Sequence, residues 1–193
     1  MSTVDGPATG TVAGLVLAAG AGRRYGMPKA LVPLDGALLV ERAVRTLTAG
    51  GCDPVTVVLG AAADDVLTRA ELGAARPVVN PDWPTGMGSS LRAGLAALPG
   101  TAVAAVVLLV DTPGVTAEAV TRLHGYASVD ALAMARYADH RGHPVLLGRG
   151  HWAGIAELAV GDTGARPYLA RHPVTEVDCT DLADDTDLDV PEG

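Results

Sequence analysis

Glycine and cationic residues gather near the start of the chain in an arrangement typical of a phosphate-binding loop. The group consists of Gly20, Gly22, Arg23, Arg24, Gly26 and Lys29. Glycine lets the backbone adopt positive φ and approach a ligand closely, so that N–H groups can converge on an anion. No acidic residue lies between Asp5 and Asp35, although the chain carries a formal net charge of -8. A positive site within an acidic protein predicts a bound phosphate group.

Lys29 is the only lysine in a chain that contains thirteen arginines. An ammonium group is a compact, mobile charge that can follow a phosphate as its charge shifts, whereas a guanidinium is a fixed planar fork. Because arginine stands at every other basic position except the histidines, we expect Lys29 to act on a phosphate group. The alternative is a solvated surface lysine.

Asp111 follows the most apolar stretch of the chain, residues 102–110, and precedes Thr112-Pro113. A carboxylate fixed at a strand end is a natural ligand for a hard cation such as Mg²⁺. The alternative is a turn or cap residue, since Asp is common before Thr-Pro in loops. A second acid would be needed to hold the ion, and the C-terminal segment offers Asp187 and Asp189.

Apolar runs alternate with segments of helical spacing, which predicts the elements that must position these residues. Strands are expected at residues 12–18, 55–59, 77–79, 102–110, 131–137, 144–147 and 174–177. Helices are expected at residues 39–47, 61–72, 116–126, 151–159 and 165–172, with one more ending near residue 98. Residues 80–90 are expected to be a long irregular loop and residues 139–143 a polar turn. This pattern predicts a three-layer α/β/α fold, doubly wound around a mostly parallel sheet.

Ligands of such folds bind beyond the carboxyl ends of the strands. The loops after the first, third and fourth predicted main strands carry the scarce polar residues of this chain. These residues are Lys29, Asn80, Ser89, Ser90 and Asp111. We therefore expect them to face one crevice.

Length and composition indicate a single domain over residues 1–193 with a core of Val, Leu and Ala. Cys52 and Cys179 have no ligand-type spacing and are expected to be buried free thiols in a reducing compartment, which favours the cytoplasm. No apolar run is long enough to span a bilayer, and the N-terminal region lacks the basic start of a secretory signal. The acidic run 178–193 is typical of a solvated tail and argues against a nucleic-acid partner.

Six spaced motifs together resemble the molybdenum cofactor nucleotidyltransferases, and the last three are similar to the cytidylyltransferase branch in particular. The first three are Leu17-Ala-Ala-Gly20-x-Gly22-x-Arg24-x-Gly26-x-Pro-Lys29, Asn80-Pro81-x-Trp83-x-x-Gly86-Met87-x-Ser89-Ser90-Leu91 and Leu109-Val-Asp111-x-Pro113. The others are Gly142-His143-Pro144-Val145, Gly161-Asp162-x-Gly164-Ala165-Arg166 and Asp187-x-Asp189-x-Pro191-Glu192. The C-terminal motif is shorter than in the family, which weakens the case for Asp189.

The resemblance implies transfer of CMP from CTP to the terminal phosphate of molybdopterin, with or without molybdenum, and release of pyrophosphate. It implies nucleotide binding by Leu17, Ala18, Ala19, Gly20, Gly22, Arg23, Asn80, Gly86, Ser89 and Ser90. It implies catalytic roles for Lys29, Arg24 and Asp111, Mg²⁺ binding by Asp111 and Asp189, and a pterin side with His143, Asp162 and Arg166. A molybdoenzyme or its maturation factor would be a partner.

Three other functions stay open. A transferase that uses GTP, or a sugar or polyol phosphate acceptor, would need the same first loop. A weakly active relative could mainly hold or hand over cofactor, given the short C-terminus. A dinucleotide-binding oxidoreductase would also begin with strand, glycine loop and helix, but here the glycines are spaced G-x-G-x-x-x-G. The second strand also ends in Leu59-Gly60 without the acid expected to bind a ribose.

Overall fold

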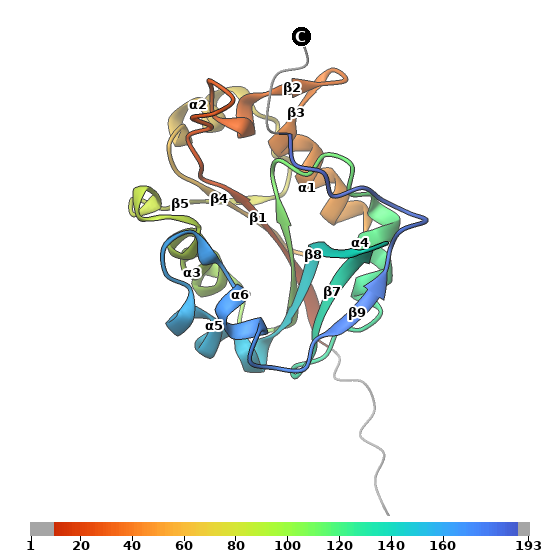
Figure 1. Cartoon of the computed structure of the whole chain (residues 1–193). Helices are drawn as coiled ribbons and strands as arrows, with labels where there is room; N and C mark the ends of the chain where they lie inside the picture. The colour runs from red at the N-terminus through yellow and green to blue at the C-terminus, as the bar shows by residue number, and fades with distance from the viewer. Residues whose placement is uncertain (1–9, 189–193) are drawn as a thin grey trace, which may run out of the picture.

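The computed structural model describes residues 10–188 and contains a seven-stranded sheet between two layers of helices (Figure 1). The strands lie in the order β5-β4-β1-β6-β8-β7-β9, and β2 and β3 form a separate small hairpin. Their bounds are β1 (Thr11–Ala18), β2 (Pro33–Leu34), β3 (Ala37–Leu38), β4 (Val55–Leu59), β5 (Arg76–Val79), β6 (Ala102–Leu109), β7 (Leu132–Tyr137), β8 (His140–Gly148) and β9 (Thr175–Asp178). Among the described strands of this sheet, only β8 is antiparallel to the others. The predicted α/β fold with a mostly parallel sheet is confirmed.

Strand register brings several strand ends to one edge of the sheet. Ala18 of β1 pairs with Leu59 of β4, which also pairs with Val79 of β5. On the other side of β1, Leu17 pairs with Leu109 of β6. The loops that follow β1, β4, β5 and β6 therefore leave from the same edge, as the sequence predicts.

Helices cover both faces of the sheet. The α-helices are α1 (Leu39–Ala49), α2 (Ala63–Arg69), α3 (Met87–Ala97), α4 (Ala117–His124), α5 (Trp152–Leu158) and α6 (Arg166–Leu169), and the 3₁₀ turns are η1 (Lys29–Leu31), η2 (Trp83–Thr85), η3 (Arg149–His151) and η4 (Gly161–Thr163). Side chains of α1, α2 and α4 join one hydrophobic cluster, and those of α3, α5 and α6 join the other. At Gly94 a Cβ atom would lie 2.6 Å from a methyl carbon of Leu15, so glycine lets α3 pack closely on β1.

Both cysteines, Cys52 and Cys179, are buried and unpaired, as predicted. Burial raises the pKa of the Cys52 thiol to about 12. No helix among residues 10–188 has both the length and the apolar character needed to cross a bilayer.

Several predicted boundaries were wrong, including the end of the helix expected at 165–172, which lies at Leu169. The helix expected at 61–72 ends at Arg69, because the chain turns back at Gly73, with φ 58°, to enter β5. The irregular loop expected at 80–90 becomes α3 at Met87, since packing of its apolar side overrides a Gly- and Ser-rich start. The expected polar turn at 139–143 belongs mostly to β8.

Candidate active site

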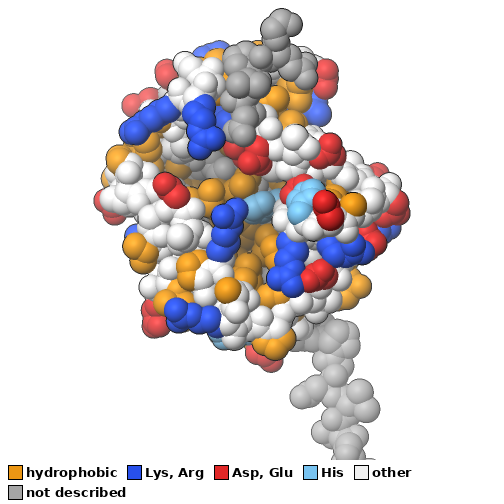
Figure 2. All heavy atoms as spheres, in the orientation of Figure 1, with side chains coloured by type: hydrophobic (Ala, Val, Ile, Leu, Met, Phe, Trp, Pro, Cys, Tyr) orange, Lys and Arg blue, Asp and Glu red, His pale blue; other side chains and the backbone are white. Residues whose placement is uncertain are grey.

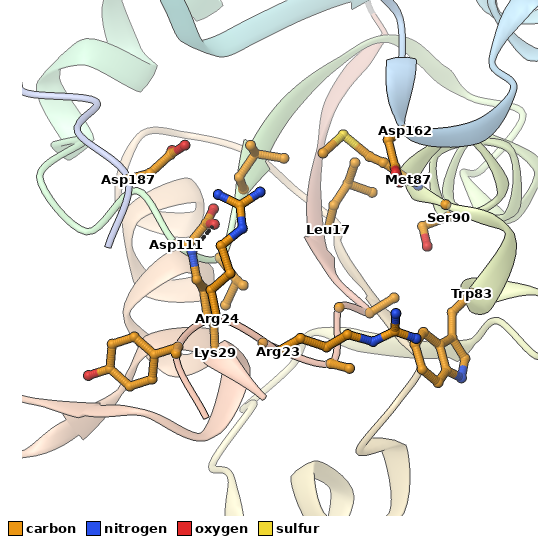
Figure 3. A pocket seen from close by; sticks show the side chains of 18 of the residues that line it. Leu17, Arg23, Arg24, Lys29, Trp83, Met87, Ser90, Asp111, Asp162 and Asp187 are labelled. Carbon is orange, nitrogen blue, oxygen red and sulfur yellow. Dashed lines mark hydrogen bonds and ion pairs between the residues drawn. The ribbon is translucent and has the colours of Figure 1, made fainter. Parts of the chain in front are cut away.

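A cleft of about 630 Å³ lies at the carboxyl edge of the sheet, a volume typical of small-molecule sites. In Figure 3, Asp111 and Asp187 lie on one side and Ser90, Met87 and Asp162 on the other. The predicted site residues that line the cleft are Leu17, Ala19, Gly20, Gly22, Arg23, Arg24, Lys29, Gly86, Ser90 and Asp111. Figure 2 shows Lys and Arg side chains around a hollow in which hydrophobic atoms are exposed.

The lysine and the strand-end carboxylate meet in this cleft. Lys29 Nζ lies 2.8 Å from Asp111 Oδ2, and the two side chains are 15% and 22% exposed. Both residues adjoin buried structure, because Ala30 and Leu31 directly after Lys29 anchor η1 in the core and Val110 is buried directly before Asp111. Partial burial lessens the screening of this pair by water. The predicted meeting of the two residues across one crevice is confirmed.

The loop between β1 and η1 depends on glycine at two of its three predicted positions. Gly22 and Gly26 have φ values of 60° and 92°, and the Gly26 N–H donates to the Gly22 carbonyl over 2.9 Å. A Cβ atom at Gly22 would lie 1.8 Å from the carbonyl oxygen of Met27. Gly20 has no positive φ, but a Cβ atom there would meet nothing within 4 Å. Gly22 therefore shapes the loop, whereas Gly20 keeps the cleft open.

Gly22→Ala and Gly20→Ala should consequently have different effects. Gly22→Ala should lower the free energy of unfolding by at least about 1 kcal/mol, because it adds left-handed strain and a backbone clash. Gly20→Ala should leave stability unchanged and weaken nucleotide binding, because its methyl group projects into the cleft. Urea unfolding and a nucleotide titration of both variants test this. Equal stability of the two variants would contradict it.

Three predicted nucleotide-binding residues do not line the cleft. Ala18 is the buried end of β1, and Asn80 and Ser89 are buried beneath the cleft wall. Asn80 Nδ2 donates to the hydroxyl oxygens of Ser89 and Ser90 over 2.9 and 3.1 Å, and its Oδ1 accepts from the Asp82 N–H. A buried amide with several partners fixes the loop that it joins. Asn80 and Ser89 therefore support this loop, and their predicted contact with the base or ribose stays a prediction.

Asp162 reaches the cleft from the turn that follows α5. Its Oδ1 accepts from the Met87 N–H at the start of α3 over 3.3 Å, so it caps a helix 75 residues away. Gly86 allows this approach, since a Cβ atom there would lie 2.4 Å from the backbone of Gly161. Of the three residues predicted on the pterin side, Asp162 lines the cleft and His143 and Arg166 do not.

Asp187 brings a second carboxylate to the side of the cleft that holds Asp111. The backbone connects the two segments, because the Leu188 N–H donates to the Asp111 carbonyl over 2.9 Å. Asp189 lies outside the described residues. Among the residues that are described, no cluster of three or more His, Cys, Asp or Glu could hold a metal. Two carboxylates fit a hard divalent ion that also takes oxygens from phosphate and water.

Several cleft residues carry no strong sequence signal of their own. Tyr25, Trp83, Met87 and Leu109 line the cleft. Figure 3 shows the Arg23 side chain extending toward Trp83. Tyr25, Trp83 and Met87 fall within the first two motifs, and Leu109 falls within the motif of Asp111, so only their place in these motifs could have indicated them.

His143 lies within β8, where the register of its pairing with β7 shifts. Burial lowers the pKa of its imidazole to about 4, while Asp185 and Asp111 act in the opposite direction and Arg166 reinforces the decrease. The ring is therefore neutral near pH 7. Its predicted role on the pterin side stays a prediction.

This lowered pKa predicts a pH-dependent loss of stability. The ordinary value is 6.5, so the unfolded chain takes up the proton first as the pH falls. The free energy of unfolding should fall between pH about 6.5 and about 4, with a slope approaching 1.4 kcal/mol per pH unit. Urea unfolding of wild type and His143→Gln at several pH values checks this. The variant should lose less stability over that interval, and identical pH profiles would contradict the assignment.

Comparison with known proteins gives one family over most of the chain. The sequence pattern of the MobA-like NTP transferase domain matches residues 14–177. A molybdenum cofactor guanylyltransferase from Rhodobacter capsulatus is 36% identical, covering 67% of this chain and 65% of that protein. A nicotine blue oxidoreductase from Paenarthrobacter nicotinovorans is 43% identical, covering 94% of this chain and 93% of that protein.

Solved structures agree with this assignment. Rv0371c from Mycobacterium tuberculosis H37Rv has a TM-score of 0.83 at 32% identity and covers 94% of each chain. A manganese complex of Rv0371C has a TM-score of 0.75 at 30% identity, covering 87% of this chain and 88% of that one. Metal binding is therefore known in a structural relative.

Proposed function

The chain belongs to the MobA-like NTP transferase family, and from this premise we propose that it transfers CMP from CTP to the terminal phosphate of a molybdopterin-type acceptor. Pyrophosphate is the second product. The observation that carries the proposal is the contact between Lys29 and Asp111 in a cleft that also holds Arg23, Arg24 and Asp187. The guanylyltransferase relative supports a pterin phosphate acceptor.

The chemistry needs no nucleophile from the protein. An oxygen of the acceptor phosphate forms the new bond to the α-phosphorus of CTP, and the bond from that phosphorus to the pyrophosphate oxygen breaks. A phosphate monoester has a second pKa of about 6, so it is mostly dianionic near pH 7 and requires no general base. The main barrier is the approach of two anions together with the charge that develops on pyrophosphate.

The cationic side chains address both parts of this barrier. Lys29 and Arg24 would neutralise the phosphates, and the backbone from Ala19 to Gly22 would supply N–H groups. Asp111 and Asp187 would hold Mg²⁺ or Mn²⁺, which when bound would neutralise phosphate oxygens and orient the leaving group. Asn80 would keep Ser90 and the start of α3 in place beside the nucleotide.

A second candidate function follows from the 43% identical relative that is named an oxidoreductase. The same glycine loop could hold the pyrophosphate of a nicotinamide dinucleotide. However, β4 continues into Gly60, where a Cβ atom would lie 2.6 Å from the Ala19 carbonyl oxygen, and no acid is present at Leu59, Gly60 or Ala61. An oxidoreductase that acts on nicotine blue is the second candidate, and nucleotidyl transfer is favoured because this acid is missing.

Product analysis distinguishes these functions. Purified protein with Mg²⁺ and molybdopterin would be given CTP, GTP, UTP or ATP in turn, and pyrophosphate release would be measured. Of the four nucleotides, only CTP should give rapid pyrophosphate release, and this release should require molybdopterin. A preference for GTP would correct the nucleotide, release with sugar or polyol phosphates would correct the acceptor, and tight pterin binding without turnover would indicate a cofactor carrier. Oxidation of NADH or NADPH by nicotine blue without pyrophosphate release would replace the proposal by the oxidoreductase.

A further inference from the structure

The described end of the acidic segment, residues 184–188, runs along the loop that leaves β6. The Asp184 N–H donates to the Gly114 carbonyl over 3.2 Å, and the Leu188 N–H donates to the Asp111 carbonyl over 2.9 Å. Between these two hydrogen bonds Asp187 lines the cleft. The sequence had predicted a solvated tail here, but this part of it lies against the body of the protein.

Asp185 anchors the middle of this segment. Its side chain is only 11% exposed, and its Oδ1 lies 2.7 Å from His140 Nε2 at the start of β8. A Cβ atom at Gly142 would lie 1.5 Å from Asp185 Oδ2, so the carboxylate occupies the space that glycine leaves free. A carboxylate with so little exposure requires a polar partner, and His140 supplies it.

We propose that the Asp185–His140 pair is a positioning device that holds Asp187 beside Asp111 for binding of a divalent cation. The inference rests on the proposed function, in which these two aspartates bind the metal. Backbone hydrogen bonds contribute about 1 kcal/mol each, so a largely buried side-chain contact at the residue two positions before Asp187 adds a substantial further restraint. A metal ligand must be held within about 0.5 Å, and second-layer partners of metal ligands supply that constraint.

Mn²⁺ binding tests this inference directly. Free Mn²⁺ would be counted by electron paramagnetic resonance during titration of the full chain with a non-hydrolysable CTP analogue. Asp185→Asn and His140→Ala should each raise the Mn²⁺ dissociation constant about tenfold, without changing metal-free binding of the analogue. His140→Gln, which retains a donor, should preserve most of the affinity. The double variant Asp185→Asn/His140→Ala should bind Mn²⁺ no more weakly than either single variant.

Asp181→Asn is the matched control, because it removes one charge from the same segment at an exposed ion pair with Arg122. It should leave Mn²⁺ affinity unchanged. Urea midpoints and near-ultraviolet circular dichroism would establish that each variant folds. Wild-type Mn²⁺ affinity in folded Asp185→Asn would overturn the positioning role alone. Failure of the wild-type protein to bind Mn²⁺ with the analogue would overturn the proposed metal site and this inference together.

Discussion

Lys29→Met should lower the turnover number of nucleotidyl transfer by about 10²- to 10³-fold while leaving the fold intact. Lys29 is the only lysine, and its ammonium group already lies within the cleft, 2.8 Å from Asp111 Oδ2. Methionine keeps much of the length of the side chain and removes the charge that would meet the phosphates. Initial rates at saturating CTP and acceptor measure the effect. Lys29→Arg should recover only part of the rate, because its planar group cannot follow the moving charge.

The same variant should bind Mn²⁺ several-fold more tightly than wild type when nucleotide is absent. In the wild-type structure the ammonium and a metal ion would compete for one carboxylate, so removal of the cation relieves that competition. Arg69→Met, at an exposed position on α2, is the control and should change neither quantity. Wild-type turnover in Lys29→Met would remove the central support for the proposed function.

Asp111→Asn should lower turnover at limiting Mg²⁺ by about 10²- to 10³-fold, since several kcal/mol of metal stabilisation would be lost. Asparagine has the size of aspartate but no charge, so the change tests electrostatics rather than packing. Turnover measured across a series of Mg²⁺ and Mn²⁺ concentrations should show a raised metal requirement. Asp187→Asn should act in the same direction with a smaller effect.

Asp64→Asn provides a control for the charge change, because Asp64 is exposed on α2 and does not line the cleft. An Asp111→Asn protein with an unchanged metal requirement would show that another group binds the ion. Retained stability in Asp111→Asn would separate this result from unfolding.

The main sheet could be predicted because its central strands are buried on both faces. Such strands appear in the sequence as continuous Val, Leu and Ala runs, and β1, β4 and β6 fall close to their predicted bounds. Ligands of such folds bind beyond the carboxyl ends of the strands, which predicts that Lys29 and Asp111 lie close together although they are 82 residues apart. Short helices were harder to predict, because their ends depend on tertiary turns such as the one at Gly73.

The supporting residues could not be distinguished from ligand-binding residues in the sequence. Asn80, Ser89 and Ser90 were predicted to face the crevice because they are scarce polar residues in this chain, yet only Ser90 lines the cleft. Likewise an acidic run is typical of a solvated tail, but Arg122, Arg136 and His140 pair with it across the fold. Their contacts join segments more than 40 residues apart, which local patterns do not reveal. The nucleotide and acceptor specificities stay proposals.

The reversed direction of β8 places its beginning, rather than its end, at the carboxyl edge of the sheet. The tight turn from β7 into β8, at Ala138 with φ 45°, therefore lies at this edge beside the C-terminal segment, which His140 contacts through Asp185. Residues added at this hairpin would extend from the carboxyl edge of the sheet, and the glycine loop after β1 would keep its sequence. Grafting at this hairpin would therefore add new surface beside the C-terminal segment while leaving the sequence of the glycine loop unchanged.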